Sequence, residues 1–255
     1  MPVLPAMGHV HGIGMNPADD DVYVATHTGV YRVSDDAAPR RVADRYQDTM
    51  GFTVVGPDQF LASGHPDLQE RSELDLPIHL GLIASDDAAQ TWQARSLAGG
   101  ADFHALDVAD NTVFGYDSLT GRVLRSSGQE AWTELYAGPV LDLAAHPART
   151  GAVLVSDPEG RLTLHRDGAR STPLPNAPRL GPVDWPTDTL LVGADARGGL
   201  HRSADRGRTW VAAGSVSGPV QALDVSDEVW LAATDTAVLR SYDEGANWQP
   251  LVRFR

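Results

Sequence analysis

The feature of this sequence that most constrains its fold is a unit of about 40 residues that recurs six times along the chain. Each unit contains short runs rich in β-forming residues, such as residues 22–25 and 229–231, separated by glycine, proline, aspartate or asparagine. No segment of comparable length has the apolar spacing of an amphipathic helix. The six units are residues 9–43, 48–97, 102–136, 138–175, 179–214 and 218–253.

About four short strands per unit, repeated at this spacing, predict an all-β fold, a six-bladed β-propeller that occupies residues 1–255 as a single domain. We expect each blade to contain its own four strands. Residues 3–4 could add a strand beside the last blade.

A turn motif recurs between the third and fourth strands. Residues 203–210 read Ser-x-Asp-x-Gly-x-Thr-Trp, and residues 241–248 differ only at Asn247, while residues 85–92 have Ala89 in the glycine position. Serine and aspartate can bond to the backbone of such a turn, and glycine allows the left-handed conformation. The motif therefore predicts the fold and not the function.

Composition excludes several functions. The chain has 34 acidic and 20 basic residues, giving a net charge of −14, which argues against nucleic-acid or anionic-membrane partners and favours cations. All basic residues are arginine, so no lysine can serve in catalysis, and the lack of cysteine excludes thiolate chemistry. No apolar stretch is long enough to span a membrane, and residues 1–7 lack the pattern of a signal peptide.

Histidines gather at one predicted end of the ring. Because neighbouring strands of a blade run antiparallel, the start of the first strand and the end of the second lie at the same end. The blade-two insertion, predicted as a long loop over residues 67–78, emerges there as well. Six of the nine histidines fall at these places in blades one to three, together with one methionine. The candidates are His9, His11, Met50 and His104 at first-strand starts, His27 and His65 at second-strand ends, and His79 after the insertion.

These side chains suit a transition metal. A site of histidine and methionine favours Cu(I), so copper is the expected ion, whereas three imidazoles would favour Cu(II) or Zn(II) and make zinc the alternative. Asp48 and Asp102 would orient the imidazoles, or bind a harder ion. The competing interpretation is that each histidine is a hydrogen-bonding group in a polar channel and that Met50 is packing.

The segments 9–17, 23–27, 48–53 and 62–67 resemble a bacterial family of BNR/Asp-box repeat propellers, usually labelled glycosylhydrolase-like or exo-α-sialidase-like. The resemblance covers nearly the whole chain. It implies a hydrolase and an extracytoplasmic protein, exported or lipid-anchored, but it brings no catalytic residues with it. Members are associated with copper-handling neighbours, which supports the metal hypothesis by association only.

Two alternative functions remain open from sequence. A glycoside hydrolase would need two carboxylates, which Asp48, Asp102 or the acids of the blade-two insertion could supply, although the arginine triad of sialidases has no counterpart here. A non-catalytic propeller would bind a protein through one face, for which Trp185 with Pro182 and Pro186 is a candidate surface. The insertion acids are Asp67, Glu70 and Glu73.

Overall fold

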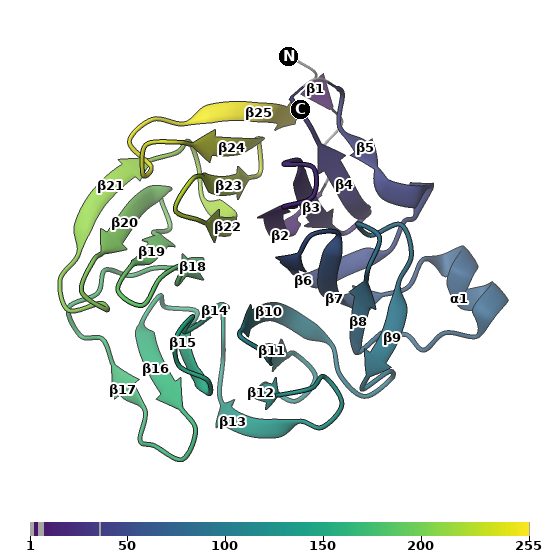
Figure 1. Ribbon diagram of the computed structural model, residues 1–255, viewed down its shortest axis with the longest axis horizontal. Coiled ribbons are helices and arrows are strands. Elements are labelled where there is room, and N and C mark those ends of the chain that lie inside the picture. The colour runs from purple at the N-terminus through teal and green to yellow at the C-terminus, as the bar shows by residue number, and fades with distance from the viewer. Residues whose placement is uncertain (1–2, 5–7, 36, 255) are drawn as a thin grey trace.

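The computed structural model describes residues 3–4, 8–35 and 37–254, and it is a six-bladed β-propeller (Figure 1). The six sheets surround a central channel, and each contains an antiparallel meander of four successive strands, as the repeats predict, to which the sheet of blade 6 adds a fifth strand. Among the described residues, no helix is long and apolar enough to cross a membrane.

The strands of each blade are numbered from the channel outwards. Blade 1 contains β2 (Val10–Met15), β3 (Val22–Thr26), β4 (Gly29–Val33) and β5 (Arg40–Arg41). Blade 2 contains β6 (Asp48–Gly56), β7 (Gln59–His65), β8 (Leu82–Ser85) and β9 (Gln93–Ser96). Blade 3 contains β10 (Phe103–Ala109), β11 (Thr112–Asp117), β12 (Arg122–Ser126) and β13 (Thr133–Ala137).

The second half of the ring repeats this order. Blade 4 contains β14 (Asp142–Ala145), β15 (Ala152–Ser156), β16 (Leu162–Arg166) and β17 (Thr172–Pro173). Blade 5 contains β18 (Val183–Asp184), β19 (Leu191–Ala194), β20 (Gly199–Ser203) and β21 (Val211–Ser215). Blade 6 contains β22 (Val220–Val225), β23 (Trp230–Thr234), β24 (Ala237–Ser241) and β25 (Gln249–Phe254).

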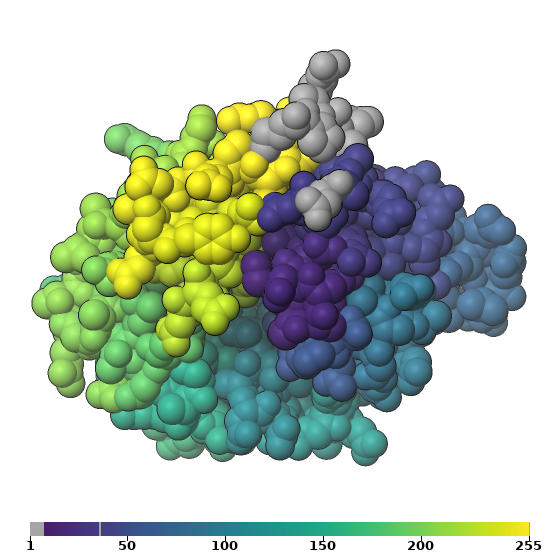
Figure 2. Space-filling view, turned by 45° about the horizontal axis from the view of Figure 1, so that its top comes forward, coloured from purple at the N-terminus to yellow at the C-terminus, as the bar shows by residue number. Residues whose placement is uncertain are grey.

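The ring closes where blade 6 meets blade 1, seen in Figure 2 as the contact between yellow and purple segments. β1 (Val3–Leu4) runs parallel to β25 on the outer edge of blade 6, so the chain crosses the joint before it begins blade 1. On the channel side, the Val10 N–H donates to Gln221 Oε1 across the same joint at 2.9 Å. The added strand at residues 3–4 is therefore confirmed.

The core lies between the blades. The second strands are the most apolar, and every residue of β3, β15 and β23 is buried. Large side chains such as Phe60, Phe114 and Leu154 are completely buried. Since burial of one such side chain contributes about 1.5–3 kcal/mol, packing between neighbouring sheets is the main stabilising term.

The recurrent turns form the expected hydrogen bonds. In blade 5, the Ser203 hydroxyl donates to Asp205 and accepts the Gly207 N–H at 2.8 Å, while Asp205 accepts bonds from the backbone and hydroxyl of Thr209. Gly207 has a φ of +80°. In blade 2, Ala89 adopts a φ of +65° at the corresponding place.

Two short helices interrupt the strands. A 3-10 turn, η1 (Val42–Asp44), ends blade 1, and α1 (Leu68–Leu74) projects from blade 2 within the insertion that the sequence predicted as a loop (Figure 1). Asp67 begins α1, because its carboxylate accepts the N–H groups of Gln69 and Glu70. The loop prediction was wrong at α1, because seven residues are too few to show a helical period.

Candidate metal centre

The ends of β6 and β7 bring two candidate side chains together at the mouth of the channel. Asp48, the first residue of β6, pairs with His65, the last residue of β7. The strands approach so closely here that a Cβ on Gly64 would overlap the Asp48 carbonyl oxygen, and Gly64 has a φ of +136°. Glycine at this position therefore allows the carboxylate and the imidazole to lie side by side.

One set of ligand atoms lies between blades 2 and 3. We call it the blade 2–3 group: His65, His79 and Asp102, whose ligand atoms lie within 4.8 Å of one another. His65 Nε2 and His79 Nδ1 each lie 3.8 Å from Asp102 Oδ2, which is too far for a hydrogen bond. His79 Nδ1 and Asp102 Oδ1 are buried and have no hydrogen-bond partner among the described residues.

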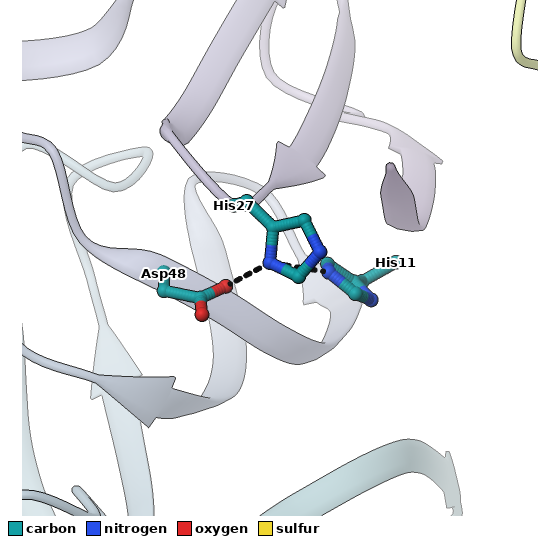
Figure 3. Close-up of side chains that lie close together, drawn as sticks. All are labelled: His11, His27 and Asp48. Atoms are coloured by element: carbon teal, nitrogen blue, oxygen red, sulfur yellow. Dashed lines mark hydrogen bonds and ion pairs between the residues drawn. The ribbon is translucent and has the colours of Figure 1, made fainter. Parts of the chain in front are cut away.

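A second set lies between blades 1 and 2, and Figure 3 shows it. We call it the blade 1–2 group: His11, His27 and Asp48, whose ligand atoms also lie within 4.8 Å of one another. His27 Nδ1 is 2.9 Å from Asp48 Oδ1 and 3.2 Å from His11 Nε2. The other oxygen of Asp48 lies 3.2 Å from His65 Nδ1, so this carboxylate connects the two groups.

The remaining candidates lie beside these groups. His104 Nε2 is 2.9 Å from Asp102 Oδ2, and the ring of His9 meets that of His11 edge-on with centroids 4.8 Å apart. Met50 is 9% exposed and lines the channel together with His9, His11 and His104. All seven predicted ligands therefore lie at or beside the channel of blades 1–3, where they form two groups with flanking residues instead of one cluster.

Protonation favours metal binding at two of these positions. Burial, with the neighbouring His27 and His9, lowers the pKa of His11 to about 3, so its imidazole is neutral at physiological pH. Burial by itself would raise the pKa of Asp102, but hydrogen bonds from His104 and Ser118 lower it below the ordinary value. A neutral imidazole and an ionised carboxylate are the forms that bind metal.

The wall of the channel contains four aspartates that the sequence analysis did not select. The channel has a volume of about 570 Å³. Burial raises the pKa of Asp107 to about 6 and that of Asp142 to about 7, and burial with mutual repulsion raises the pKa values of Asp184 and Asp224 as well. Aligning the six repeats could have revealed three of these aspartates, because they occupy the same place in their blades. Asp107, Asp184 and Asp224 each come three residues after the corresponding first-strand positions, His104, Gly181 and Gln221.

Each of these aspartates accepts a backbone N–H from the next blade. The donors are Ala145 to Asp107 at 2.7 Å, Val183 to Asp142 at 2.9 Å, Val225 to Asp184 at 2.6 Å, and Met15 to Asp224. Carboxylates placed this way join the inner strands of blades 3, 4, 5, 6 and 1. They therefore have a structural role in the channel wall.

The insertion acids and Trp185, which the sequence offered for catalysis and for protein binding, make structural contacts instead. Asp67 caps α1, and Glu70 forms an ion pair with Arg45 at 2.7 Å. Trp185 is only 4% exposed and packs on His146 with ring centroids 4.4 Å apart, so it cannot belong to a docking face. The sequence analysis placed Trp185 with Pro182 and Pro186 on a candidate surface, whereas its side chain fills the gap between blades 4 and 5.

Comparison with known proteins supports the fold. No protein-family model and no curated protein matches the chain. Among solved structures, it is similar to YCF48 bound to D1 peptide, with 16% identity and a TM-score of 0.56 over 98% of this chain and 84% of that one. The WD40 β-propeller domain of Doa1 has 9% identity and a TM-score of 0.62 over 97% and 83%.

PorZ, a surface component of the type-IX secretion system of Porphyromonas gingivalis, has 12% identity and a TM-score of 0.61. The match covers all of this chain and 35% of PorZ. At such identities the likeness shows the fold alone. The protein is a six-bladed β-propeller with two groups of histidine and aspartate at its channel mouth.

Proposed function

We propose that this propeller binds a transition-metal ion at the channel mouth through the blade 2–3 group. The observation that carries the proposal is the pair of buried atoms without hydrogen bonds, His79 Nδ1 and Asp102 Oδ1. A buried polar atom left without a partner costs about 1–3 kcal/mol. An ion bound between His65 Nε2, His79 Nδ1 and Asp102 Oδ1 would remove this cost, because Oδ2 already accepts hydrogen bonds from His104 and Ser118.

The spacing of the blade 2–3 group supports an ion better than a direct contact. Ligands bound at about 2.1 Å to a four-coordinate ion lie about 3.4 Å apart. The two histidine nitrogens lie 3.8 Å from Asp102 Oδ2, so small side-chain movements would complete the site. Asp48, 3.2 Å from the other nitrogen of His65, would then orient that imidazole, as carboxylates commonly do for metal-bound histidine.

The donor atoms indicate which ion to test. Imidazole nitrogen with carboxylate oxygen suits Cu(II) and Zn(II), and in such a site Cu(II) generally binds more tightly. Cu(I) would need the Met50 thioether in addition to the histidines. We therefore propose copper as the ion and zinc as the alternative. We do not propose glycoside hydrolysis, because imidazoles contact oxygens of both Asp48 and Asp102.

The test is metal analysis of protein purified without a histidine tag, followed by competitive titration with Cu(II) and Zn(II). His79→Gln and Asp102→Asn should each lower the affinity of the blade 2–3 site by more than about 100-fold, since losing a metal–ligand bond costs more than the roughly 10–100-fold typical of losing a residue that only orients a ligand. The control is His201→Gln, which removes a histidine paired with Asp195 at 3.0 Å in blade 5 and should change nothing. Absence of stoichiometric metal, or equal effects of control and test variants, would contradict the proposal.

A second candidate function, protein binding, is favoured by α1. Its side chains Leu68 and Leu74 are 82% and 66% exposed, and Ile78 in the same insertion is also exposed. Apolar side chains gathered on one projecting element are typical of contact surfaces. If this surface binds a protein, Leu68→Ser with Leu74→Ser should abolish the capture of partners that the wild type retains, while metal binding is unchanged.

A further inference from the structure

The blade 1–2 group contains a contact that hydrogen bonding cannot fully satisfy. His27 Nδ1 lies within hydrogen-bonding distance of two atoms, Asp48 Oδ1 at 2.9 Å and His11 Nε2 at 3.2 Å. If His27 Nδ1 carries a proton, it can donate that proton to only one of these two atoms. If His27 Nδ1 carries no proton, its lone pair faces the negatively charged Asp48 carboxylate. One cation among the three atoms would satisfy all of them.

Two of the three distances within this group are close to those of ligands around one ion. At metal–ligand bonds of about 2.0–2.2 Å, neighbouring ligand atoms lie about 3–3.5 Å apart. The separations of 2.9 Å and 3.2 Å lie at or near this range, and the ligand atoms of all three residues lie within 4.8 Å of one another. His9, whose ring contacts His11, lies beside the group and could supply a further nitrogen. Figure 3 shows the three side chains converging from β2, the β3–β4 turn and β6.

The two groups have no ligand residue in common. The blade 2–3 group uses His65, His79 and Asp102, and the blade 1–2 group uses His11, His27 and Asp48. Their connection is the carboxylate of Asp48, with Oδ1 facing His27 and Oδ2 facing His65 Nδ1. Asp48 is thus placed to bind one ion directly and to hold a ligand of the other.

We propose that the mouth binds two metal ions, the second in the blade 1–2 group, and that Asp48 couples them. This inference rests on the proposed function, because the first ion occupies the blade 2–3 group. An ion on Asp48 Oδ1 withdraws electron density from the carboxylate and weakens its hydrogen bond to His65. Two nearby cations also repel each other. The ion in the blade 1–2 group therefore binds more weakly when the blade 2–3 group is occupied than when that group is empty.

Titration with Cu(II) alone tests the stoichiometry. The wild type should bind two ions in two steps, measured by calorimetry and by metal analysis after desalting. Electron paramagnetic resonance should show isolated Cu(II) after one equivalent and dipolar broadening after two, because the coupled ions lie close together. Two ions without broadening would place the second ion elsewhere and overturn the inference.

Variants separate the two groups. His27→Gln and Asp48→Asn should each lose the second ion and keep the first. Asp48→Asn should also bind the first ion somewhat more weakly, since His65 loses its carboxylate acceptor. His79→Gln should lose the first ion, and the control His201→Gln should keep both.

The outcomes distinguish this inference from the function on which it rests. If the wild type binds a single ion and both His27→Gln and His79→Gln lose it, the two groups form one shared site. That result would overturn the two-ion inference and leave the proposal of metal binding standing. No bound ion at all would overturn both. Two ions of which neither depends on His27 would overturn the inference alone.

Discussion

Replacing Asp142 by asparagine tests whether the channel aspartates control stability as pH changes. Asp142 accepts the Val183 N–H at 2.9 Å and joins blade 4 to blade 5. Burial raises the pKa of its carboxyl from 3.8 to about 7. The folded protein therefore holds this proton more tightly than the unfolded chain, and the associated stability is complete below about pH 4 and is lost as pH rises through about 7.

The magnitude follows from the size of this rise. Each pH unit by which burial raises the pKa costs the ionised form about 1.4 kcal/mol, so complete desolvation would destabilise the protein by about 4 kcal/mol at pH 8. Asp142 keeps some contact with the channel, which admits water, and we take about half of that value. About 2 kcal/mol corresponds to roughly 5 °C in the midpoint of thermal unfolding for a domain of this size.

Asp142→Asn should keep the inter-blade hydrogen bond through its amide oxygen and remove the charge. We expect the wild type to lose about 5 °C more than the variant between pH 4.5 and pH 8, measured by scanning calorimetry in one buffer series. The other channel aspartates titrate in both proteins and cancel in this difference, apart from the repulsion between Asp107 and Asp142, which the variant also removes. Parallel pH profiles for the two proteins would refute the reasoning, because they would mean that Asp142 is ionised at no cost.

Three further predictions concern the fold and the mouth. Ser203→Ala leaves the buried Gly207 N–H without its acceptor and should lower the free energy of unfolding by about 1–3 kcal/mol in denaturant titration; an unchanged midpoint would refute the role of that bond. Gly64→Ala should cost about 2–3 kcal/mol through strain at its positive φ and weaken metal binding, whereas Gly128→Ala, in open space, should do neither. Met50→Leu keeps the packing volume and should change Cu(II) affinity by less than about threefold in competition titration; a selective loss of Cu(I) would instead place the thioether among the ligands.

The sequence predicts the ring because each repeat contains its own strands and turns. The residues of the Ser203 turn specify local geometry, and antiparallel pairing then places Asp48 and His65 at one end. The sequence does not show which histidines meet, because the division into two groups depends on blade spacing and on side-chain direction. His79, for example, reaches Asp102 from a loop whose path α1 determines.

The channel aspartates were missed for a related reason. An aspartate within a strand is usually assigned to the solvent-facing side of the sheet. Side chains alternate between the two faces of a strand, and this alternation does not show whether a face lines a channel or the outer surface. Asp107 and Asp224 become distinctive only when the blades are aligned in register. Their acceptor role depends on a backbone N–H in the next blade, which no pattern within one repeat can indicate.

The aspartate-to-amide hydrogen bonds join blades 3, 4, 5, 6 and 1 in one direction around the ring. At the positions three residues after His11 and Met50, blades 1 and 2 have Gly14 and Thr53 instead. The arc without these bonds is the arc that contains the histidines. Other bonds join the blades of that arc, such as those from the Asp58 N–H to Asn16 Oδ1 and from the Phe103 N–H to Ser63 Oγ. Ions at the mouth would add a further connection there, so metal binding should slow backbone hydrogen exchange more in blades 1–3 than in blades 4–6.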